Sequence, residues 1–257
     1  MSKATLTIDG SLGLITLCDP PLNLISPELA DDLLAVVLSL RQKELRGLII
    51  KSEGNFSAGA NMSLFIGKDA KGGREILDKF LVGIIRNIEA LPYPTLAVVR
   101  GLCLGGGFEL ALACDLIWAS QEAKFGAVEA TIGTVPLGAG TRMLAARAGA
   151  ARAKEMVFEA KIYAADQMEK WNIVNKVVSD GEITEQAFKY MQRIAQGPTL
   201  AHEVSKKLNS AFYDGGRSSS DDLLLEIVPP LFETGDFIGG VKSLVENGPG
   251  KAKFTAK

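Results

Sequence analysis

Three consecutive glycines followed closely by a glutamate are the residues of this chain best suited to chemistry. Gly105, Gly106 and Gly107 come after a short apolar run, and residues 108–113 have strong helix propensity. A helix that begins at these glycines would leave backbone N–H groups unpaired at the positive end of its dipole. Glu109 would place a carboxylate in the first turn, beside those donors. The segment therefore suits an anion or a developing oxyanion next to an acid–base group.

The glycine run has a second, purely structural interpretation. No Lys-Ser or Lys-Thr pair follows it as in a P-loop, and its spacing differs from Gly-x-Gly-x-x-Gly. Tight packing of a strand against a helix would explain the glycines equally well. An acid in the first turn of a helix is favourable by about 0.3–1 kcal/mol without any catalytic role. Alone, the segment leaves both interpretations open.

A second carboxylate lies in an unusual setting. Glu129 is the only charged residue between Lys124 and Arg142, in a run of small and apolar residues. Buried carboxylates are costly unless they are paired or used. The alternative is a carboxylate satisfied by backbone N–H groups in a Gly-rich turn. A third segment, residues 56–62, has a glycine bend and by itself is typical of an ordinary loop.

Composition limits the classes of function. The chain has 257 residues, of which 47% are hydrophobic and 23% charged, and its formal net charge is −2. This balance argues against a nucleic-acid-binding surface, which would need a basic excess. The N-terminus lacks the apolar core of a signal peptide, and no apolar run reaches the roughly 18 residues of a membrane helix. Three cysteines in apolar surroundings (Cys18, Cys103 and Cys114) indicate buried, reduced thiols, so we expect a cytoplasmic protein without membrane contact.

The spacing of apolar residues, together with the residues typical of turns and helix starts, predicts an α/β protein. Residues 5–17 alternate around Asp9-Gly10 as in a hairpin, and Ser26-Pro27 predicts the start of a helix that runs to about Arg46. Further along the chain, apolar runs predict strands and spaced apolar residues predict helices. The predicted strands are 47–51, 95–99, 115–119 and 174–178; the predicted helices are 74–90, one from about Gly107, 150–158, 164–171 and nearly everything from 184 onward. The pattern favours an α/β core followed by a helical portion.

Taken together, the three segments resemble the enoyl-CoA hydratase/isomerase (crotonase) superfamily. The matching motifs are Ser57-Ala58-Gly59-Ala60, Leu104-Gly105-Gly106-Gly107-Phe108-Glu109, Phe125-Gly-Ala-Val-Glu129 and Gly133-Thr-Val-Pro136. Their order and spacing fit, and weaker similarity extends the match over essentially the whole chain. The motifs are specific for the superfamily and less so for the reaction, because members share a fold and differ in chemistry.

The resemblance implies a fold and an assembly. It predicts a spiral of ββα units, with residues 1–195 as the α/β catalytic core and residues 196–257 as a C-terminal helical trimerisation region. The assembly would be a homotrimer or a homohexamer. The substrate would be an acyl thioester, usually of coenzyme A. Coenzyme A would take part only as a portion of that substrate. No metal and no further cofactor are implied.

The resemblance also implies the site. The thioester oxygen would lie between the backbone N–H groups of Ala60 and Gly106. Hydratases of this family carry glutamates at the positions of Glu109 and Glu129, so the chain resembles enzymes that add water syn across a 2-enoyl thioester. Glu109 is expected to activate the water and Glu129 to protonate carbon. The remaining residues expected to contact the substrate are Ala58, Asn61, Met62, Gly105 and Leu137.

Two departures from the family pattern bear on the substrate. Asn61 stands where most members have Asp, and Leu137 follows Pro136 where Gly is frequent. The N–H of Leu137 remains available to the water, but its side chain is expected to narrow the pocket. Two alternatives stay open: an isomerase, dehydratase or decarboxylase acting on a branched or carrier-bound thioester, and a non-catalytic binding subunit with the same fold.

Overall fold

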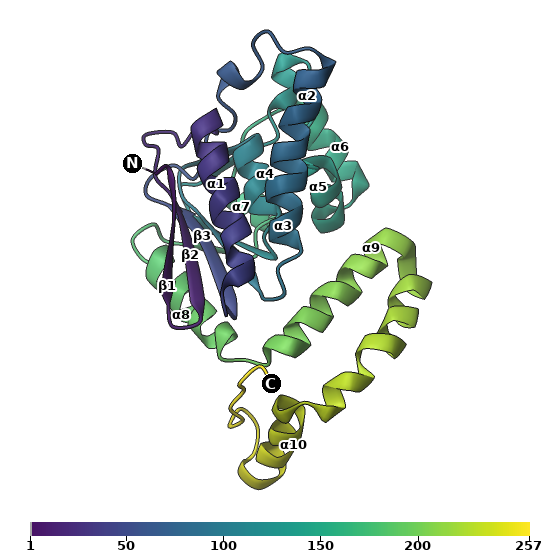
Figure 1. Cartoon of the computed structure of the whole chain (residues 1–257). Helices are drawn as coiled ribbons and strands as arrows, with labels where there is room; N and C mark the ends of the chain where they lie inside the picture. Colours follow the sequence, from purple (N-terminus) through teal and green to yellow (C-terminus); the bar gives the residue numbers. More distant parts are fainter. Residues whose placement is uncertain (1) are drawn as a thin grey trace.

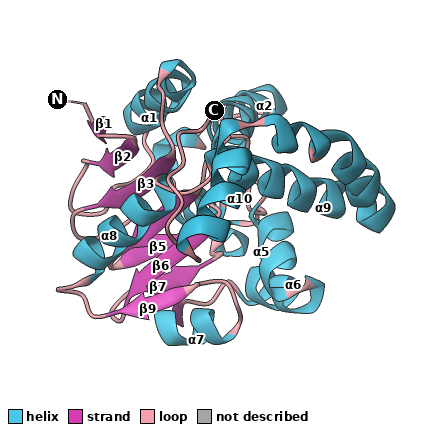
Figure 2. Cartoon of the chain, turned by 90° about the horizontal axis from the view of Figure 1, so that it is seen from below, coloured by secondary structure: helices cyan, strands magenta, loops and turns pink. Residues whose placement is uncertain are grey.

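A six-stranded sheet forms the centre of the fold (Figures 1 and 2). In the computed structural model, which describes residues 2–257, its strand order is β1-β2-β3-β4-β6-β9. The strands are β1 (Ala4–Asp9), β2 (Leu12–Leu17), β3 (Gly47–Ser52), β4 (Thr95–Val99), β6 (Leu116–Ser120) and β9 (Lys176–Val178). β1 and β2 form the predicted antiparallel hairpin, and the other neighbours pair in parallel.

A second, three-stranded sheet accompanies the first. It consists of β5 (Leu102–Leu104), β7 (Lys124–Gly126) and β8 (Tyr163–Ala164). After β4 the chain adds β5 to the small sheet and then forms α4 (Gly106–Leu112). After β6 it adds β7 and then forms the 3-10 turn η4 (Glu129–Ile132). Each unit thus gives one strand to each sheet before it turns helical, which confirms the predicted spiral α/β fold.

Side-chain alternation along the strands builds a core on both faces of the large sheet. Leu48 and Ile50 of β3 point into one cluster, whereas Ile49 points into the other. The first cluster is covered by α1 (Pro27–Ser39), α4 and α5 (Gly140–Ala148), and the second by α8 (Ile183–Ala195). Figure 2 shows α8 on one side of the sheet and α5 on the other.

One long helix lies over the first cluster and has three sections. These are α2 (Ala70–Leu77), the π-helical section η3 (Asp78–Ile85) and α3 (Arg86–Glu89). Asp69 caps its start, because the side chain accepts the N–H of Gly72 at 2.9 Å. The remaining elements are η1 (Leu40–Gln42), η2 (Met62–Leu64), α6 (Ala150–Glu159), α7 (Ala165–Lys170), α9 (Thr199–Ile227), η5 (Pro229–Glu233) and α10 (Gly235–Asn247).

Two local predictions were wrong, and one helix was missed. The helix that starts at Pro27 ends at Ser39 rather than near Arg46, because Arg46 already pairs its N–H with Ser11 ahead of β3. Cys18 is exposed, since it follows the last residue of β2, whereas Cys103 and Cys114 are buried as expected. Helix α5 was not predicted, because the glycines at its start are typical of a loop.

The last two helices leave the core and form an arm (Figure 1). α9 turns back on itself at Gly216, whose φ of 74° interrupts the helical backbone, and α10 follows at the end of the arm. Within residues 2–257 no helix has the length and apolar character needed to cross a membrane. The division at residue 195 remains a prediction.

Candidate active site

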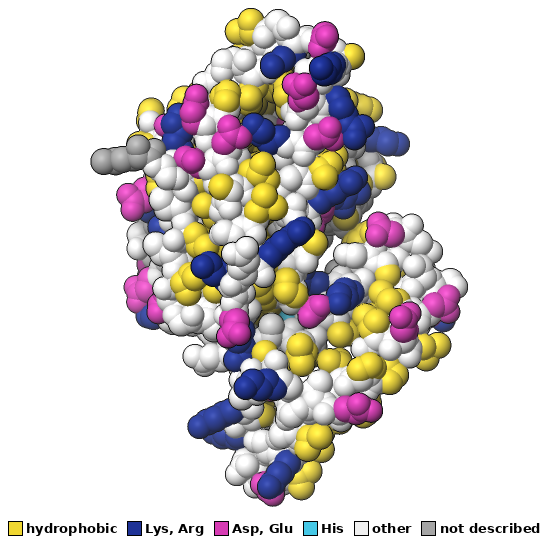
Figure 3. Space-filling view, in the orientation of Figure 1, with side chains coloured by type: hydrophobic (Ala, Val, Ile, Leu, Met, Phe, Trp, Pro, Cys, Tyr) yellow, Lys and Arg dark blue, Asp and Glu magenta, His cyan; other side chains and the backbone are white. Residues whose placement is uncertain are grey.

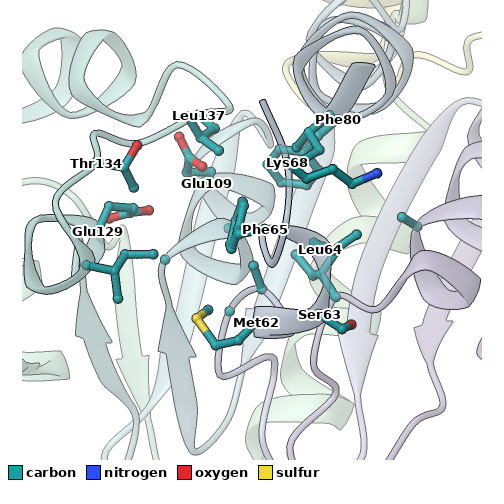
Figure 4. Close-up of a pocket in the computed structure, with 18 of the residues that line it drawn as sticks. Met62, Ser63, Leu64, Phe65, Lys68, Phe80, Glu109, Glu129, Thr134 and Leu137 are labelled. Carbon is teal, nitrogen blue, oxygen red and sulfur yellow. The ribbon is translucent and has the colours of Figure 1, made fainter. Parts of the chain in front are cut away.

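A cavity of about 340 Å³ brings the predicted site residues together (Figure 4). One side is formed by the loop after β3 and by the start of α4. A second side is formed by η4 and the turn that follows it. The helix of residues 70–85 supplies the third side through residues spaced as on one helical face, namely Gly72, Glu75, Ile76, Lys79 and Phe80.

The glycine run is explained by backbone geometry at two of its positions. Gly105 precedes α4 with φ 51° and ψ −128°, a conformation that side chains disfavour. A Cβ on Gly107 would lie 2.5 Å from the Cβ of Ser57, so the helix can approach that loop only with glycine there. As a result α4 begins at the cavity wall with the N–H of Gly106 unpaired, because no acceptor for it exists within residues 2–257.

Ala60 offers a second unpaired N–H group. It lies in a parallel bridge with Ile25, in which Ile25 donates to the carbonyl of Gly59 and Asn61 donates to the carbonyl of Ile25. The N–H of Ala60 itself donates to no group in the described part of the chain. Since Ala60 and Gly106 both line the cavity, two backbone donors are available to a ligand there.

Glu109 is a buried carboxylate held by two backbone donors. Its side chain is 3% exposed, and Oε1 accepts the N–H groups of Gly138 and Gly140 at 2.7 Å each. Gly140 is the first residue of α5 and Gly138 precedes its N-cap, Ala139, so both donors lie at the positive end of that helix. Burial raises the pKa of Glu109 to about 8; the bonds from Gly138 and Gly140 oppose this shift, and the nearby charge of Glu129 adds to it.

Glu129 is buried without such support. It is 9% exposed, and neither carboxylate oxygen accepts a hydrogen bond from any group of residues 2–257. Burial raises the pKa of Glu129 as well. The alternative of a carboxylate satisfied by backbone N–H groups therefore does not apply to Glu129, whereas it does describe Glu109. Burial thus favours the protonated form of both carboxyls, and they differ in the backbone donors that oppose this at Glu109.

The other predicted contact residues divide into two groups. Ala58, Met62, Gly105 and Leu137 line the cavity together with the residues above. Asn61 does not; its side chain accepts the N–H of Ser63 at 3.0 Å and caps η2. Its role in substrate binding stays a prediction.

The third side of the cavity was missed from the sequence. Residues 74–90 were predicted as a helix from apolar spacing, but nothing in that spacing separates Ile76 and Phe80, which line the cavity, from the residues that only pack on the core. The cavity-lining face mixes a glycine, charged residues and apolar ones, so no single type of residue marks it. The part that this helix plays in the cavity depends on how it lies against the loop after β3, which the sequence does not predict.

Comparison with known proteins agrees with the predicted family. The model of the family described as enoyl-CoA hydratase/isomerase matches residues 7–249. The mitochondrial methylglutaconyl-CoA hydratase of Rattus norvegicus is 35% identical over 174 residues, which cover 64% of this chain and 54% of that protein. The probable enoyl-CoA hydratase of Rhizobium meliloti is 34% identical over 212 residues, which cover 80% of this chain and 81% of that protein.

A solved structure extends the agreement to the whole fold. The crystal structure of enoyl-CoA hydratase subunit I from Geobacillus kaustophilus superposes with a TM-score of 0.91 at 30% identity, covering 99% of this chain and 98% of that one. The chain spans about half the length of the rat relative and about four fifths of the Rhizobium one. With the family model matching nearly all of its residues, the chain belongs to the enoyl-CoA hydratase/isomerase family.

Proposed function

We propose that this chain is an enoyl-CoA hydratase, which adds water across the double bond of a 2-enoyl-CoA thioester to give a 3-hydroxyacyl-CoA. The observation that carries the proposal is the pair of buried carboxyls, Glu109 and Glu129, in one cavity with the unpaired N–H groups of Ala60 and Gly106. Hydration needs a base for water, an acid for carbon and donors for the enolate oxygen. Family membership adds to this support.

The donors act on the thioester. Its carbonyl oxygen accepts the N–H groups of Ala60 and Gly106, and it gains negative charge as water attacks C3. Donors already in place stabilise that charge without reorganisation, and removing one typically costs about 3–4 kcal/mol in the transition state. Glycine at 105 and 107 allows the start of α4 to lie at the cavity wall, where the N–H of Gly106 can reach the thioester.

The carboxyls divide the proton transfers. Water lies between them; Glu109 accepts its proton while the oxygen bonds to C3, and Glu129 donates a proton to C2. The pair shares one proton, and in the form that adds water Glu109 is the charged member, which the N–H groups of Gly138 and Gly140 stabilise, while Glu129 holds the proton. Water and the thioester supply every atom of the product, so coenzyme A takes part only as the carrier in the substrate.

A direct assay tests the proposal. We expect hydration of crotonyl-CoA, followed through loss of the enoyl thioester chromophore, and a fall in rate by about 100-fold or more in Glu109→Gln and in Glu129→Gln. Glu122→Gln changes an exposed glutamate near β7 and serves as the matched control. A product of unchanged mass would instead identify an isomerase. Thioester binding without turnover across a panel of acyl groups would identify a binding subunit.

We further propose that the arm assembles copies of the chain into a homotrimer or homohexamer. Apolar side chains are exposed along α9, η5 and α10, and Figure 3 shows hydrophobic side chains gathered over these helices. They are Phe212, Tyr213, Leu224, Leu225, Phe232, Phe237, Ile238, Val241, Leu244 and Val245. A cytoplasmic location remains a prediction from the sequence.

Light scattering of the purified chain tests the assembly. Leu225→Asp and Val245→Asp place charges on side chains that are 73% and 81% exposed, and we expect each to shift the mass toward the monomer. Ile8→Asp on β1 is the control, because its side chain is exposed and lies outside the arm. A wild-type chain of monomeric mass would contradict the proposal.

A further inference from the structure

Two aromatic rings line the cavity, Phe65 and Phe80, and Phe80 is the more buried of the two (Figure 4). Phe80 lies in the π-helical section η3 and is 8% exposed, and Ile76 precedes it by one turn on the same helical face. π-helical turns inside α-helices occur frequently at functional sites. The ring of Phe80 is therefore a candidate for a role in the reaction that the carboxyls do not fill.

Two glycines show how close this ring lies to the proposed reacting groups. A Cβ on Gly106 would lie 3.4 Å from Cζ of Phe80, and a Cβ on Gly138 would lie 2.7 Å from its Cε1. The N–H of Gly106 is a proposed donor to the thioester, and the N–H of Gly138 binds Glu109. The ring therefore borders the space that the acyl carbons just beyond C3 would occupy.

Behind the ring lies the protein core. The same Cβ on Gly138 would lie 3.1 Å from Cγ1 of Ile85, and Ile84 and Ile85 are both fully buried. A longer acyl chain would have to displace Phe80 or these residues. Well-packed interiors resist added methylene groups, because side chains are forced out of their preferred rotamers.

The opposite end of the cavity is open. Met62 is 47% exposed and Ser63 is exposed, and Figure 4 shows both at the end away from Glu109, Leu137 and Phe80. Other exposed residues of the wall are Lys68, Glu75, Thr131 and Ile132. With the thioester oxygen placed at Ala60 and Gly106, the carrier extends from there past Met62, and the acyl group extends toward Phe80.

We propose that Phe80 is a specificity-determining residue that ends the acyl pocket, so that the chain acts on short 2-enoyl thioesters. This inference rests on the proposed function, because it places the thioester at Gly106 and C3 at the carboxyls. Removing the ring opens space at the point where a longer chain is blocked.

Binding of saturated thioesters tests Phe80 apart from catalysis. Isothermal titration with butyryl-CoA and decanoyl-CoA is compared for the wild type, Phe80→Ala, Phe80→Leu and the control Val82→Ala, which changes an exposed residue of the same helix. We expect the wild type to bind butyryl-CoA more tightly. Phe80→Ala is expected to raise the affinity for decanoyl-CoA relative to butyryl-CoA by about 10-fold or more, with a smaller change in Phe80→Leu and none in Val82→Ala.

The outcomes separate this inference from the proposed function. An unchanged affinity ratio in a Phe80→Leu protein with wild-type melting overturns the inference, as does a wild type that prefers decanoyl-CoA. A changed ratio supports it even if no enoyl-CoA is hydrated, a result that would reject only the hydratase. When hydration occurs, the ratio of kcat/KM for 2-decenoyl-CoA and crotonyl-CoA is expected to move in the same direction as binding.

Discussion

The two regions that carry Glu109 and Glu129 are built in different ways. Glu109 lies on α4 and accepts two N–H groups from the start of α5, which follows it by about thirty residues in the chain. Glu129 begins the short turn η4 directly after β7, and no group of residues 2–257 donates to its oxygens. Burial favours the protonated form of both carboxyls, and at Glu109 the N–H groups of Gly138 and Gly140 oppose that effect. Two identical side chains thus have different surroundings in one cavity.

The difference also separates fixed from adjustable parts of the site. A Cβ on Gly138 would lie 3.2 Å from Cδ of Glu109, and a Cβ on Gly140 would lie 2.9 Å from its Oε1. The carboxylate of Glu109 is therefore enclosed. The side-chain oxygens of Glu129 have no hydrogen-bond partner within residues 2–257. The prediction is that Glu109 has one defined geometry, whereas Glu129 takes its geometry from the bound substrate.

The largest expected effect separates the two proton transfers. Exchange of the C2 protons of butyryl-CoA with heavy water needs a base at carbon and donors at the thioester oxygen, but no base for water. If Glu129 serves carbon, Glu129→Gln lowers this exchange by about 10²–10⁴-fold, whereas Glu109→Gln leaves it within about 10-fold of the wild type. Mass spectrometry of the recovered thioester measures the exchange.

The control for the exchange experiment is the hydration rate of the same two variants. Both are expected to lose hydration, so that retained exchange in Glu109→Gln demonstrates an intact donor pair and an intact Glu129. If Glu109→Gln instead abolishes exchange and Glu129→Gln retains it, the two roles are reversed.

The second effect is on stability. The pKa of Glu109 is about 8 in the folded chain, above the value of about 4.3 for an exposed glutamate. A raised pKa means that the stability this carboxyl contributes is complete below about pH 4.3 and is lost as the pH rises through 8. Glu109→Gln removes that dependence. The difference in free energy of unfolding, variant minus wild type, should therefore increase by up to ~5 kcal/mol as the pH rises from 4.5 to 8.5, at about 1.4 kcal/mol per pKa unit.

Denaturant unfolding at a series of pH values measures this gain. Glu129→Gln should change in the same direction, because burial raises the pKa of Glu129 too. The exposed control Glu122→Gln should run parallel to the wild type. Parallel curves for Glu109→Gln would mean that its carboxyl titrates as in water and that the enclosure by α5 has no electrostatic effect.

The sequence revealed the two carboxyls for local reasons. Glu109 follows a glycine run, and Glu129 is a lone charge in an apolar stretch, so both depart from their surroundings within a few residues. The cap at Ser26 and the apolar run of β3 are equally local, and both were predicted. The resemblance to a family added the donor at Ala60, which no pattern of side chains marks.

The rest depended on contacts between distant residues. Nothing near Glu109 predicts that Gly138 and Gly140 donate to it, because every residue except proline has a backbone N–H and residue type does not show which of them donate. Phe80 is one apolar residue among many in its helix, and its position at the cavity depends on how that helix crosses α4. The raised pKa of each glutamate is likewise a property of the folded chain, because burial causes it.

The smallest expected effect concerns the proton that the pair shares. Hydration needs one carboxylate and one carboxylic acid, so the active pair carries one proton, whichever residue holds it. Since the pKa of Glu109 beside charged Glu129 is about 8, the pair loses its last proton near that pH. The value of kcat/KM for crotonyl-CoA should therefore fall about tenfold per pH unit above pH 8. Steady-state rates between pH 6 and 9.5 measure the decline, with Glu122→Gln as the control. A rate that continues to rise through pH 9 would show that the acid for C2 lies outside the pair, and the contrast between the two regions would then not explain the chemistry.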